Sequence, residues 1–326
     1  MDSAVTDSVL TGSGSLPPQV FAVTGATGYL GSRLARRLHH RGHTVVVLKR
    51  SRSNVARIAD ILPDLRSYDV DVQPVDAIFE KQRYSCLLHC ATDYGRTTGS
   101  RPSVIDANLV LPLRLLDAAI RHGTPFFVNT DTVLDTRVSD YSLSKRQFRE
   151  YLAKASASIC GINVAIEHFY GPADDASKFV GGMVRRLLAG DARIGLTPGA
   201  QLRDFVYIDD VVAAFEIILE HNITSPQPAV SGPVAGDALR CYEVGSGSTV
   251  SIREFMTTLC RLAGREHGVL EFGAIQYREN EVMHSQAWVA PLLSLGWKPQ
   301  VGLEEGLWRT LVDEQLRMRS ARQCAI

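Results

Sequence analysis

Short apolar runs alternate with amphipathic stretches through the first half of the chain. In the stretches at 29–41 and 106–122, leucines recur at helical spacing, as at Leu30, Leu34 and Leu38. The runs that predict buried strands are Val20–Thr24, Thr44–Leu48, Val70–Val72, Cys86–Cys90 and Phe126–Asn129. This alternation predicts an α/β fold, a Rossmann-type parallel sheet doubly wound by helices, with ligands at the carboxyl ends of the strands.

The second half has a less regular pattern. It predicts a strand at 163–169, helices at 178–189, 251–262 and 303–318, and short apolar segments at 205–208 and 242–244. We predict a flexible leader at 1–18 and a dinucleotide-binding Rossmann domain at 19–170, with a return segment at about 203–245. The rest, 171–202 and 246–326, is predicted to form a smaller substrate-binding lobe.

Composition and charge narrow the classes of partner. The 326 residues include 35 basic and 35 acidic side chains, so neither nucleic acid nor a membrane surface is expected as the main partner. No stretch is apolar for long enough to span a bilayer, and the start lacks the features of a secretory signal. The six cysteines form no C-x-x-C pair, which predicts a cytoplasmic protein with free thiols and no metal site.

A glycine-rich turn follows the first predicted strand. Gly25, Gly28 and Gly31 have the spacing G-x-x-G-x-x-G and lead directly into a predicted helix. Such glycines allow a tight turn and close approach of a phosphate, and the helix N-terminus offers N–H groups to a pyrophosphate. We therefore predict a dinucleotide site. Its expected contacts are Gly25, Thr27, Gly28, Tyr29, Leu30 and Ala91.

The end of the second predicted strand bears on the choice of cofactor. NAD-binding proteins usually place an acid here, but this chain has Lys49, Arg50 and Arg52, with Ser51 and Ser53 between them. Such a site suits the 2′-phosphate of NADP(H), which we prefer, with Arg50, Ser51 and Arg52 as contacts. NAD(H) stays the alternative, because a basic loop at a strand end can also be a solvated surface.

Three side chains around the fifth predicted strand suggest ketone chemistry. Thr130 ends that strand, and Tyr141 and Lys145 are one helical turn apart. Tyr141 can donate a proton to a ketone oxygen, and Lys145 can lower the pKa of the phenol and contact the cofactor. Thr130 can align the carbonyl oxygen.

These residues, with "TGATGYLG", "LLHCAT", "YSLSK", "FYGP" and "RDFVYIDDVV", resemble the extended branch of the short-chain dehydrogenase/reductase superfamily. That branch holds NAD(P)-dependent sugar-nucleotide epimerases, dehydratases and reductases. The resemblance implies that Asn108 is a structural and proton-relay residue and that Arg203 and Arg278 bind the diphosphate of a nucleotide sugar. It places Glu281 near the nucleoside ribose, and it implies a homodimer formed through helices near 106–122 and 141–154.

Departures from the branch pattern refine the expected reaction. Dehydratases of the branch have Thr-Asp-Glu after the fifth strand, whereas this chain has Thr130, Asp131 and Thr132, so dehydration by that route is not expected. His168 stands where an Asn is usual. The motifs are most similar to reductases of the CDP-abequose synthase type, which implies NADPH-dependent 4-keto reduction of a CDP-4-keto-3,6-dideoxyhexose. The expected substrate contacts are Asp93, Tyr94, Asp131, Thr132, His168, Asp175, Arg203, Arg278 and Glu281.

Three alternatives remain at this stage. A reductase of small lipophilic ketones or aldehydes is disfavoured by the two arginines that suit a diphosphate. A nucleotide-sugar 4-epimerase would retain bound NAD, which the basic end of the second strand disfavours. A dinucleotide-binding sensor without catalysis would not need the Thr, Tyr and Lys that this chain retains.

Overall fold

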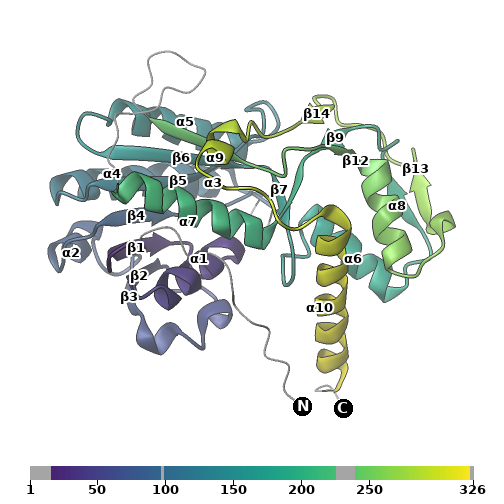
Figure 1. Cartoon of the computed structure of the whole chain (residues 1–326), viewed down its shortest axis with the longest axis horizontal. Coiled ribbons are helices and arrows are strands. Elements are labelled where there is room, and N and C mark those ends of the chain that lie inside the picture. Colours follow the sequence, from purple (N-terminus) through teal and green to yellow (C-terminus); the bar gives the residue numbers. More distant parts are fainter. Residues whose placement is uncertain (1–15, 97–98, 225–238, 324–326) are drawn as a thin grey trace.

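A seven-stranded sheet forms the centre of the larger lobe (Figure 1). The computed structural model describes residues 16–96, 99–224 and 239–323, so the leader predicted at 1–18 lies mostly outside the described residues. The strand order is β11-β6-β5-β4-β1-β2-β3, and all neighbouring pairs are parallel. The strands are β1 (Val20–Thr24), β2 (Thr44–Lys49), β3 (Arg66–Asp69), β4 (Cys86–His89), β5 (Phe126–Thr132), β6 (Cys160–Ile166) and β11 (Arg240–Val244). The predicted Rossmann-type fold is confirmed.

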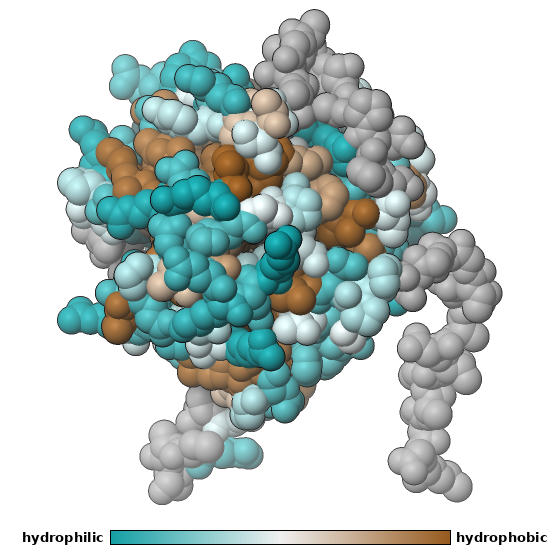
Figure 2. Space-filling view, turned by 90° about the vertical axis from the view of Figure 1, so that its left-hand side faces the viewer, coloured by the Kyte–Doolittle hydropathy of each residue, from teal (hydrophilic) through white to brown (hydrophobic). Residues whose placement is uncertain are grey.

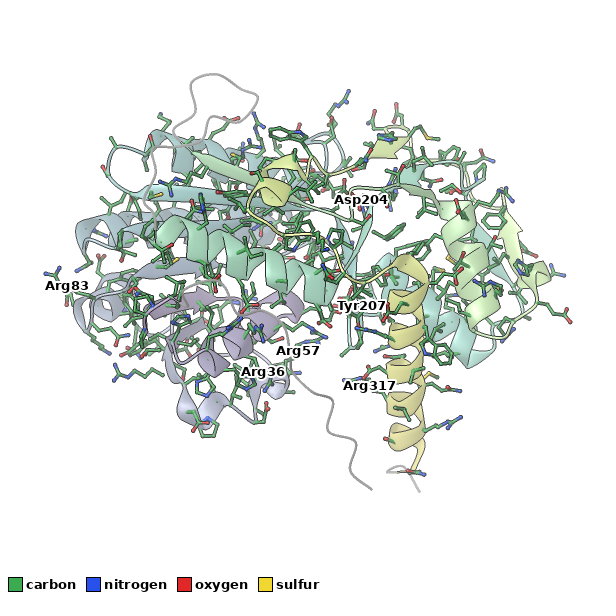
Figure 3. All side chains as sticks on the ribbon, viewed as in Figure 1. Arg36, Arg57, Arg83, Asp204, Tyr207 and Arg317 are labelled. Carbon is green, nitrogen blue, oxygen red and sulfur yellow. The ribbon has the colours of Figure 1, made fainter. Side chains whose placement is uncertain are left out.

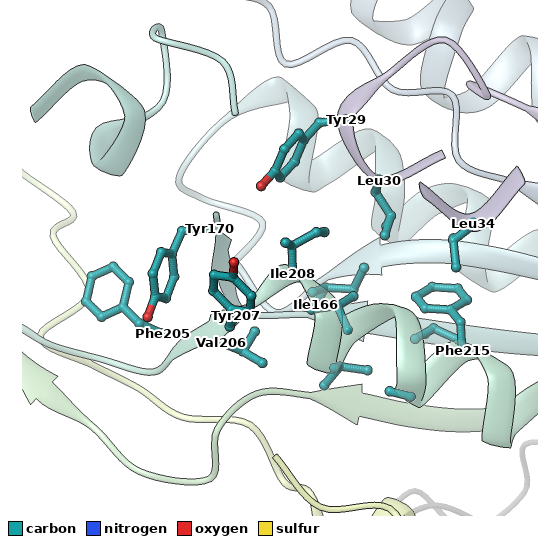
Figure 4. Packing of buried hydrophobic residues seen from close by; sticks show 14 of the residues in the cluster. Tyr29, Leu30, Leu34, Ile166, Tyr170, Phe205, Val206, Tyr207, Ile208 and Phe215 are labelled. Atoms are coloured by element: carbon teal, nitrogen blue, oxygen red, sulfur yellow. The ribbon is translucent and has the colours of Figure 1, made fainter. Parts of the chain in front are cut away.

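Helices cover both faces of this sheet, because each helix has one apolar face to bury. One face carries α1 (Tyr29–His40) and α7 (Ile208–Thr224), whose Leu34 and Phe215 are buried in the same core (Figure 4). The other face buries Phe127 against Leu116 and Phe148. It is covered by α2 (Val75–Glu80), α3 (Arg101–Ile105), α4 (Leu111–Arg121) and α5 (Asp140–Lys154).

One predicted element of the larger lobe was wrong in its bounds, and another agrees in its bounds but has an unexpected local form. The third strand, predicted at 70–72, is β3 at Arg66–Asp69, and Val72 is 73% exposed. β3 is an edge strand that pairs only with β2, so its partly exposed residues give no apolar run. The helix predicted at 106–122 begins with a π-helical turn at Asp106–Val110 before α4, which carries Pro112 in its first turn.

The strand predicted at 163–169 was also wrong, because the structure divides it at Glu167. β6 ends at Ile166 within the large sheet, and β7 (His168–Tyr170) pairs instead with β10 (Phe205–Tyr207). The chain leaves the sheet here and enters the smaller lobe.

The smaller lobe lies beside the carboxyl ends of the sheet strands (Figure 1). Its principal helices, α6 (Phe179–Ala189), α8 (Ile252–Leu262) and α10 (Leu303–Gln323), confirm the three predicted helices within a few residues. Its remaining elements are β8 (Ile194–Leu196), β9 (Leu202–Arg203), β12 (Val250–Ser251), β13 (Leu270–Phe272) and β14 (His284–Ser285). The short helix α9 (Ala290–Ser294) returns to the larger lobe and contacts β11. The 3₁₀ turns of the described residues are Ala56–Ile58, Leu62–Asp64 and His267–Val269.

A buried carboxylate helps to fix the junction between the lobes. Asp204 accepts hydrogen bonds from the backbone N–H of Ser246 at 2.6 Å, its hydroxyl at 2.7 Å and the N–H of Gly247 at 3.0 Å (Figure 3). Burial raises the pKa of Asp204, and these donors offset part of that cost. The junction is therefore held by directed bonds as well as by apolar packing.

The outer surface is mixed. On the face of the larger lobe seen in Figure 2, hydrophilic residues separate smaller hydrophobic patches. Among the described helices, none is both long and apolar enough to cross a membrane.

Candidate active site

The strand order reverses between β1 and β4, and the glycine turn lies at that point. Gly25 has φ +68°, and a Cβ there would lie 2.5 Å from the backbone nitrogen of Ala91. A Cβ on Gly31 would collide with the carbonyl oxygen of Gly25. The turn therefore requires glycine at both positions, for a positive φ at the first and for close packing at both.

This turn meets the physical requirements of a dinucleotide site. Gly28 is the N-cap of α1, and the helix has neither a side-chain cap nor an acid in its first turn. Its first N–H groups and its positive dipole end are therefore free to bind an anion, because no carboxylate of the helix occupies them. The adjoining cleft has a volume of about 2050 Å³, more than one ligand of ordinary size fills, so a dinucleotide and a second ligand both fit. The predicted contacts Thr27, Tyr29, Leu30 and Ala91 line it.

Basic and acidic groups meet at the carboxyl ends of β2 and β3. Lys49 and Arg50 line the cleft, whereas Arg52 is exposed outside its lining. The hydroxyl of Ser51 donates to Asp69 Oδ2 at 2.6 Å, and its N–H donates to Asp71 Oδ2 at 2.9 Å. Sequence reasoning missed these acids because Asp69 ends β3 and Asp71 follows it, and that strand was placed too late in the chain.

Lys145 and Thr130 are joined through the end of β5. The Lys145 ammonium donates to the Thr130 carbonyl oxygen at 2.8 Å, and the Thr130 hydroxyl donates to the carbonyl oxygen of His89 at 3.0 Å. Burial lowers the pKa of Lys145 to about 8, and the nearby Asp131 carboxylate opposes this shift. The amine is thus fixed in position and still mainly cationic at neutral pH.

Tyr141 lines the cleft and packs against a second tyrosine, Tyr94. Its ring centroid is 4.9 Å from that of Tyr94. Burial, with Tyr94 beside it, raises the pKa of Tyr141 well above its usual value, and a hydrogen bond with Thr132 opposes the rise. The phenol therefore keeps its proton, as a general acid must before it donates.

Asn108 lies behind these groups on the π-helical turn. Its amide donates to the Asp93 carbonyl oxygen at 2.8 Å and to Ser144 Oγ at 3.2 Å, and its oxygen accepts from the Asp93 N–H at 2.9 Å. Both amide hydrogens are therefore engaged in tying the loop after β4 to α5. The structural part of the predicted role has a clear basis, while the proton-relay part stays a prediction.

Asp131 is held from the neighbouring strand. Its carboxylate accepts from Asn163 Nδ2 at 2.9 Å and from the Thr132 N–H at 2.8 Å. Asp131 and Thr132 both line the cleft. Thr132, a hydroxyl with no basic group, stands where the dehydratase pattern has a glutamate.

The smaller lobe contributes arginines to the same cleft. Arg203 is 9% exposed; it donates to Glu281 Oε1 at 2.6 Å and to the Leu202 carbonyl oxygen at 2.8 Å. Burial lowers the pKa of Arg203, and the Glu281 and Glu167 carboxylates oppose that shift. Arg278 is exposed at the cleft. The predicted diphosphate contacts therefore share one region.

His168 also lines the cleft, and its partner was not anticipated. His168 Nδ1 lies 2.8 Å from Glu167 Oε2, and Ser285 Oγ donates to Glu167 Oε1 at 2.5 Å. The available signal was a charged residue inside an apolar strand pattern, "VAIEHF".

Lys178 is a second cleft residue that sequence reasoning missed. Its amine is 3.0 Å from Asp174 Oδ1 and lies over the rings of Phe169 and Tyr29, at 4.3 and 5.0 Å from their centroids. The predicted contacts Asp93 and Asp175 also line the cleft, and their carboxylates accept local hydrogen bonds. Among the described residues, no group of three His, Cys, Asp or Glu side chains could hold a metal ion.

The fold and this site place the chain in a known family. The model of the NAD dependent epimerase/dehydratase family matches residues 21–230, and the chain belongs to that family. It is therefore an enzyme of an NAD(P)-dependent class, as the glycine turn and the Tyr–Lys pair predict.

Similar proteins extend this finding. CDP-abequose synthase from Salmonella typhimurium is 32% identical over 297 residues, covering 87% of this chain and 95% of that protein. The CDP-abequose synthase of Salmonella muenchen is 28% identical over 89% of this chain and 96% of that protein. The UDP-glucose 4-epimerase of Thermotoga maritima, solved with UDP-glucose, has the same fold with a TM-score of 0.76, 22% identity and coverage of 92% and 99%.

Proposed function

We propose that this protein is an NADPH-dependent 4-ketoreductase of a nucleotide-activated deoxyhexose, with a CDP-4-keto-3,6-dideoxyhexose as its substrate class. The observation that carries the proposal is one cleft lined by Tyr141 and Thr130 and also by Arg203 and Arg278. Lys145 is buried behind this lining and bonded to the Thr130 carbonyl oxygen. The likeness to two CDP-abequose synthases supports a nucleotide-sugar substrate and favours CDP as the nucleotide.

The residues would divide the work as follows. The turn at Gly25 and the N-terminus of α1 would hold the cofactor diphosphate, and Lys49 and Arg50 would hold a 2′-phosphate. When bound, the reduced nicotinamide supplies the hydride for the ketone carbon. Arg203 and Arg278 would orient the substrate through its diphosphate.

Residues of α5 and β5 would carry out the proton transfer. Tyr141, which keeps its proton, would donate it to the ketone oxygen as negative charge develops there. The Lys145 cation is proposed to stabilise the resulting phenolate. Thr132 can hydrogen-bond the same phenol. We also propose that the enzyme acts in the cytoplasm as a homodimer.

A nucleotide-sugar 4-epimerase is the second candidate, because the solved structures with this fold include several epimerases. Thr132 and the cleft would serve either reaction, but Lys49 and Arg50 favour an exchanging NADPH.

The test is NADPH oxidation by the purified protein with CDP-, dTDP-, UDP- and GDP-linked 4-keto sugars, together with the cofactor content after purification. Oxidation with the CDP substrate and little with NADH supports the proposal. Tightly bound NAD, with interconversion of C4 epimers and no net oxidation, would replace it by the epimerase.

A further inference from the structure

Glu167 is a carboxylate with no exposed side-chain surface at the point where the chain leaves the large sheet. Burying a carboxylate costs free energy unless both of its oxygens have partners. Here Oε2 meets His168 Nδ1 at 2.8 Å and Oε1 accepts from Ser285 Oγ at 2.5 Å. Each oxygen thus has its own partner, one on β7 and one on β14.

His168 is held by this contact in one orientation. Its ring packs edge-on against Phe205, with 5.7 Å between centroids, and its side chain is 31% exposed and lines the cleft. An ionised carboxylate only accepts, so Nδ1 carries the proton that is shared with Glu167. Nε2 has no hydrogen-bond partner among the described residues, which leaves it as the ring nitrogen for a ligand.

We propose that Glu167 is a positioning residue that acts through His168. By accepting from Nδ1, it fixes the ring and its tautomer and presents Nε2 to the sugar-diphosphate part of the bound substrate. The identity of that substrate rests on the proposed function. Arg203 lines the same cleft as His168, so both side chains can contact the diphosphate of one bound substrate.

A double-mutant cycle tests whether Glu167 acts through His168. The variants are Glu167→Leu, His168→Asn and the double variant, with KM and kcat measured for the 4-keto sugar nucleotide. Each single change should raise KM up to about 10-fold, as expected for one lost hydrogen bond to a ligand, while kcat changes little. The double variant should match His168→Asn. NADPH affinity, measured by fluorescence, should stay within about 2-fold in all variants.

Two further variants distinguish positioning of the His168 ring from a general stabilising role of Glu167 in the fold. Glu167→Gln keeps an oxygen that can accept from Nδ1, so its KM should lie close to that of the unchanged protein rather than at the raised value of Glu167→Leu. Ser285→Ala removes the other bond and should leave KM close to that of the unchanged protein. If Glu167→Leu causes a further loss in the His168→Asn background, Glu167 acts independently of the ring and the inference is overturned.

A spectroscopic readout needs neither turnover nor a folded Glu167→Leu variant. In protein labelled with ¹⁵N-histidine, the His168 signals, identified by their loss in His168→Asn, should show a protonated Nδ1; a ring protonated only at Nε2 overturns the inference. If the unchanged protein reduces no 4-keto sugar nucleotide, the proposed function is wrong, but the role inferred for Glu167 is still open to test. The same double-mutant cycle is then measured as calorimetric affinities for CDP- and UDP-sugars. A double variant that matches His168→Asn supports the inference, and a further loss of affinity in it overturns the inference.

Discussion

The Lys145 ammonium donates to the main-chain carbonyl of Thr130 at 2.8 Å, so the helix that carries Tyr141 is joined to the end of β5. Lys145 is 1% exposed, and its pKa of about 8 reflects burial opposed by Asp131. Since a lysine is cationic below its pKa, activity that needs the cation should fall as the pH rises through about 8.

Asp131→Asn should move this fall in activity, the basic limb of the pH profile, to lower pH. The change removes the carboxylate that opposes the effect of burial, so the pKa of Lys145 should fall below about 8. The measurement is the pH dependence of kcat at saturating substrates. Asp175→Asn, at an exposed carboxylate of the same cleft, is the control and should leave the limb in place. An unmoved limb in Asp131→Asn would show that Asp131 does not set the charge of Lys145.

Tyr141→Phe should lower single-turnover ketone reduction by about 10²–10⁴-fold, because the ring stays but the donated proton is lost. NADPH affinity should be unchanged. Tyr151→Phe is the matched control, since it removes a phenol from an exposed tyrosine of the same helix outside the cleft lining, and it should retain reduction. Full activity in Tyr141→Phe would assign proton donation to another group.

Gly25→Ala should abolish dinucleotide binding. The new Cβ requires a strained positive φ and lies 2.5 Å from the Ala91 nitrogen, so the turn has to move. Gly42→Ala is the matched control: its φ is +82°, but a Cβ there meets nothing within 4 Å. The control should lose only about 1–2 kcal/mol of unfolding free energy and keep its affinity. Equal losses of affinity in both would mean that strain, and not the close approach, is responsible.

Arg50→Ser should weaken NADPH binding by about 10-fold and leave NADH binding nearly unchanged, as expected for a lost phosphate contact. Arg83→Ser, at an arginine that does not line the cleft (Figure 3), is the charge-matched control. The readout is the Kd for each cofactor by fluorescence titration. If Kd rises equally for NADPH and NADH, Arg50 does not bind the 2′-phosphate.

Tyr151→Glu should convert the proposed dimer to a monomer in light scattering. Tyr151 and Leu143 are 48% and 44% exposed and lie eight residues apart on α5, so they share one face of the helix. Trp308→Glu, at a 55% exposed tryptophan on α10, is the control. If the unchanged protein is a monomer at micromolar concentration, or if only the control dissociates, the α5 interface is wrong.

Much of the fold could be predicted, because its signals are local. β1 and the N-terminus of α1 lie where the apolar run and the glycines put them, and Tyr141 and Lys145 share a helix face through their spacing alone. β3 could not be placed, since an edge strand that is exposed on one side gives little periodicity. The split at Glu167 also had no local signal strong enough to end a strand.

By itself the sequence determined the parallel Rossmann sheet, the phosphate turn and the Tyr–Lys pair, because short-range spacing and backbone sterics govern each of these. Only the tertiary structure decided the partners of the cleft residues. Glu167 meets Ser285 across 118 positions of the chain, and Arg203 meets Glu281 across 78. Such pairs depend on how the smaller lobe packs against the sheet, and that packing is a property of the whole buried core rather than of any local pattern.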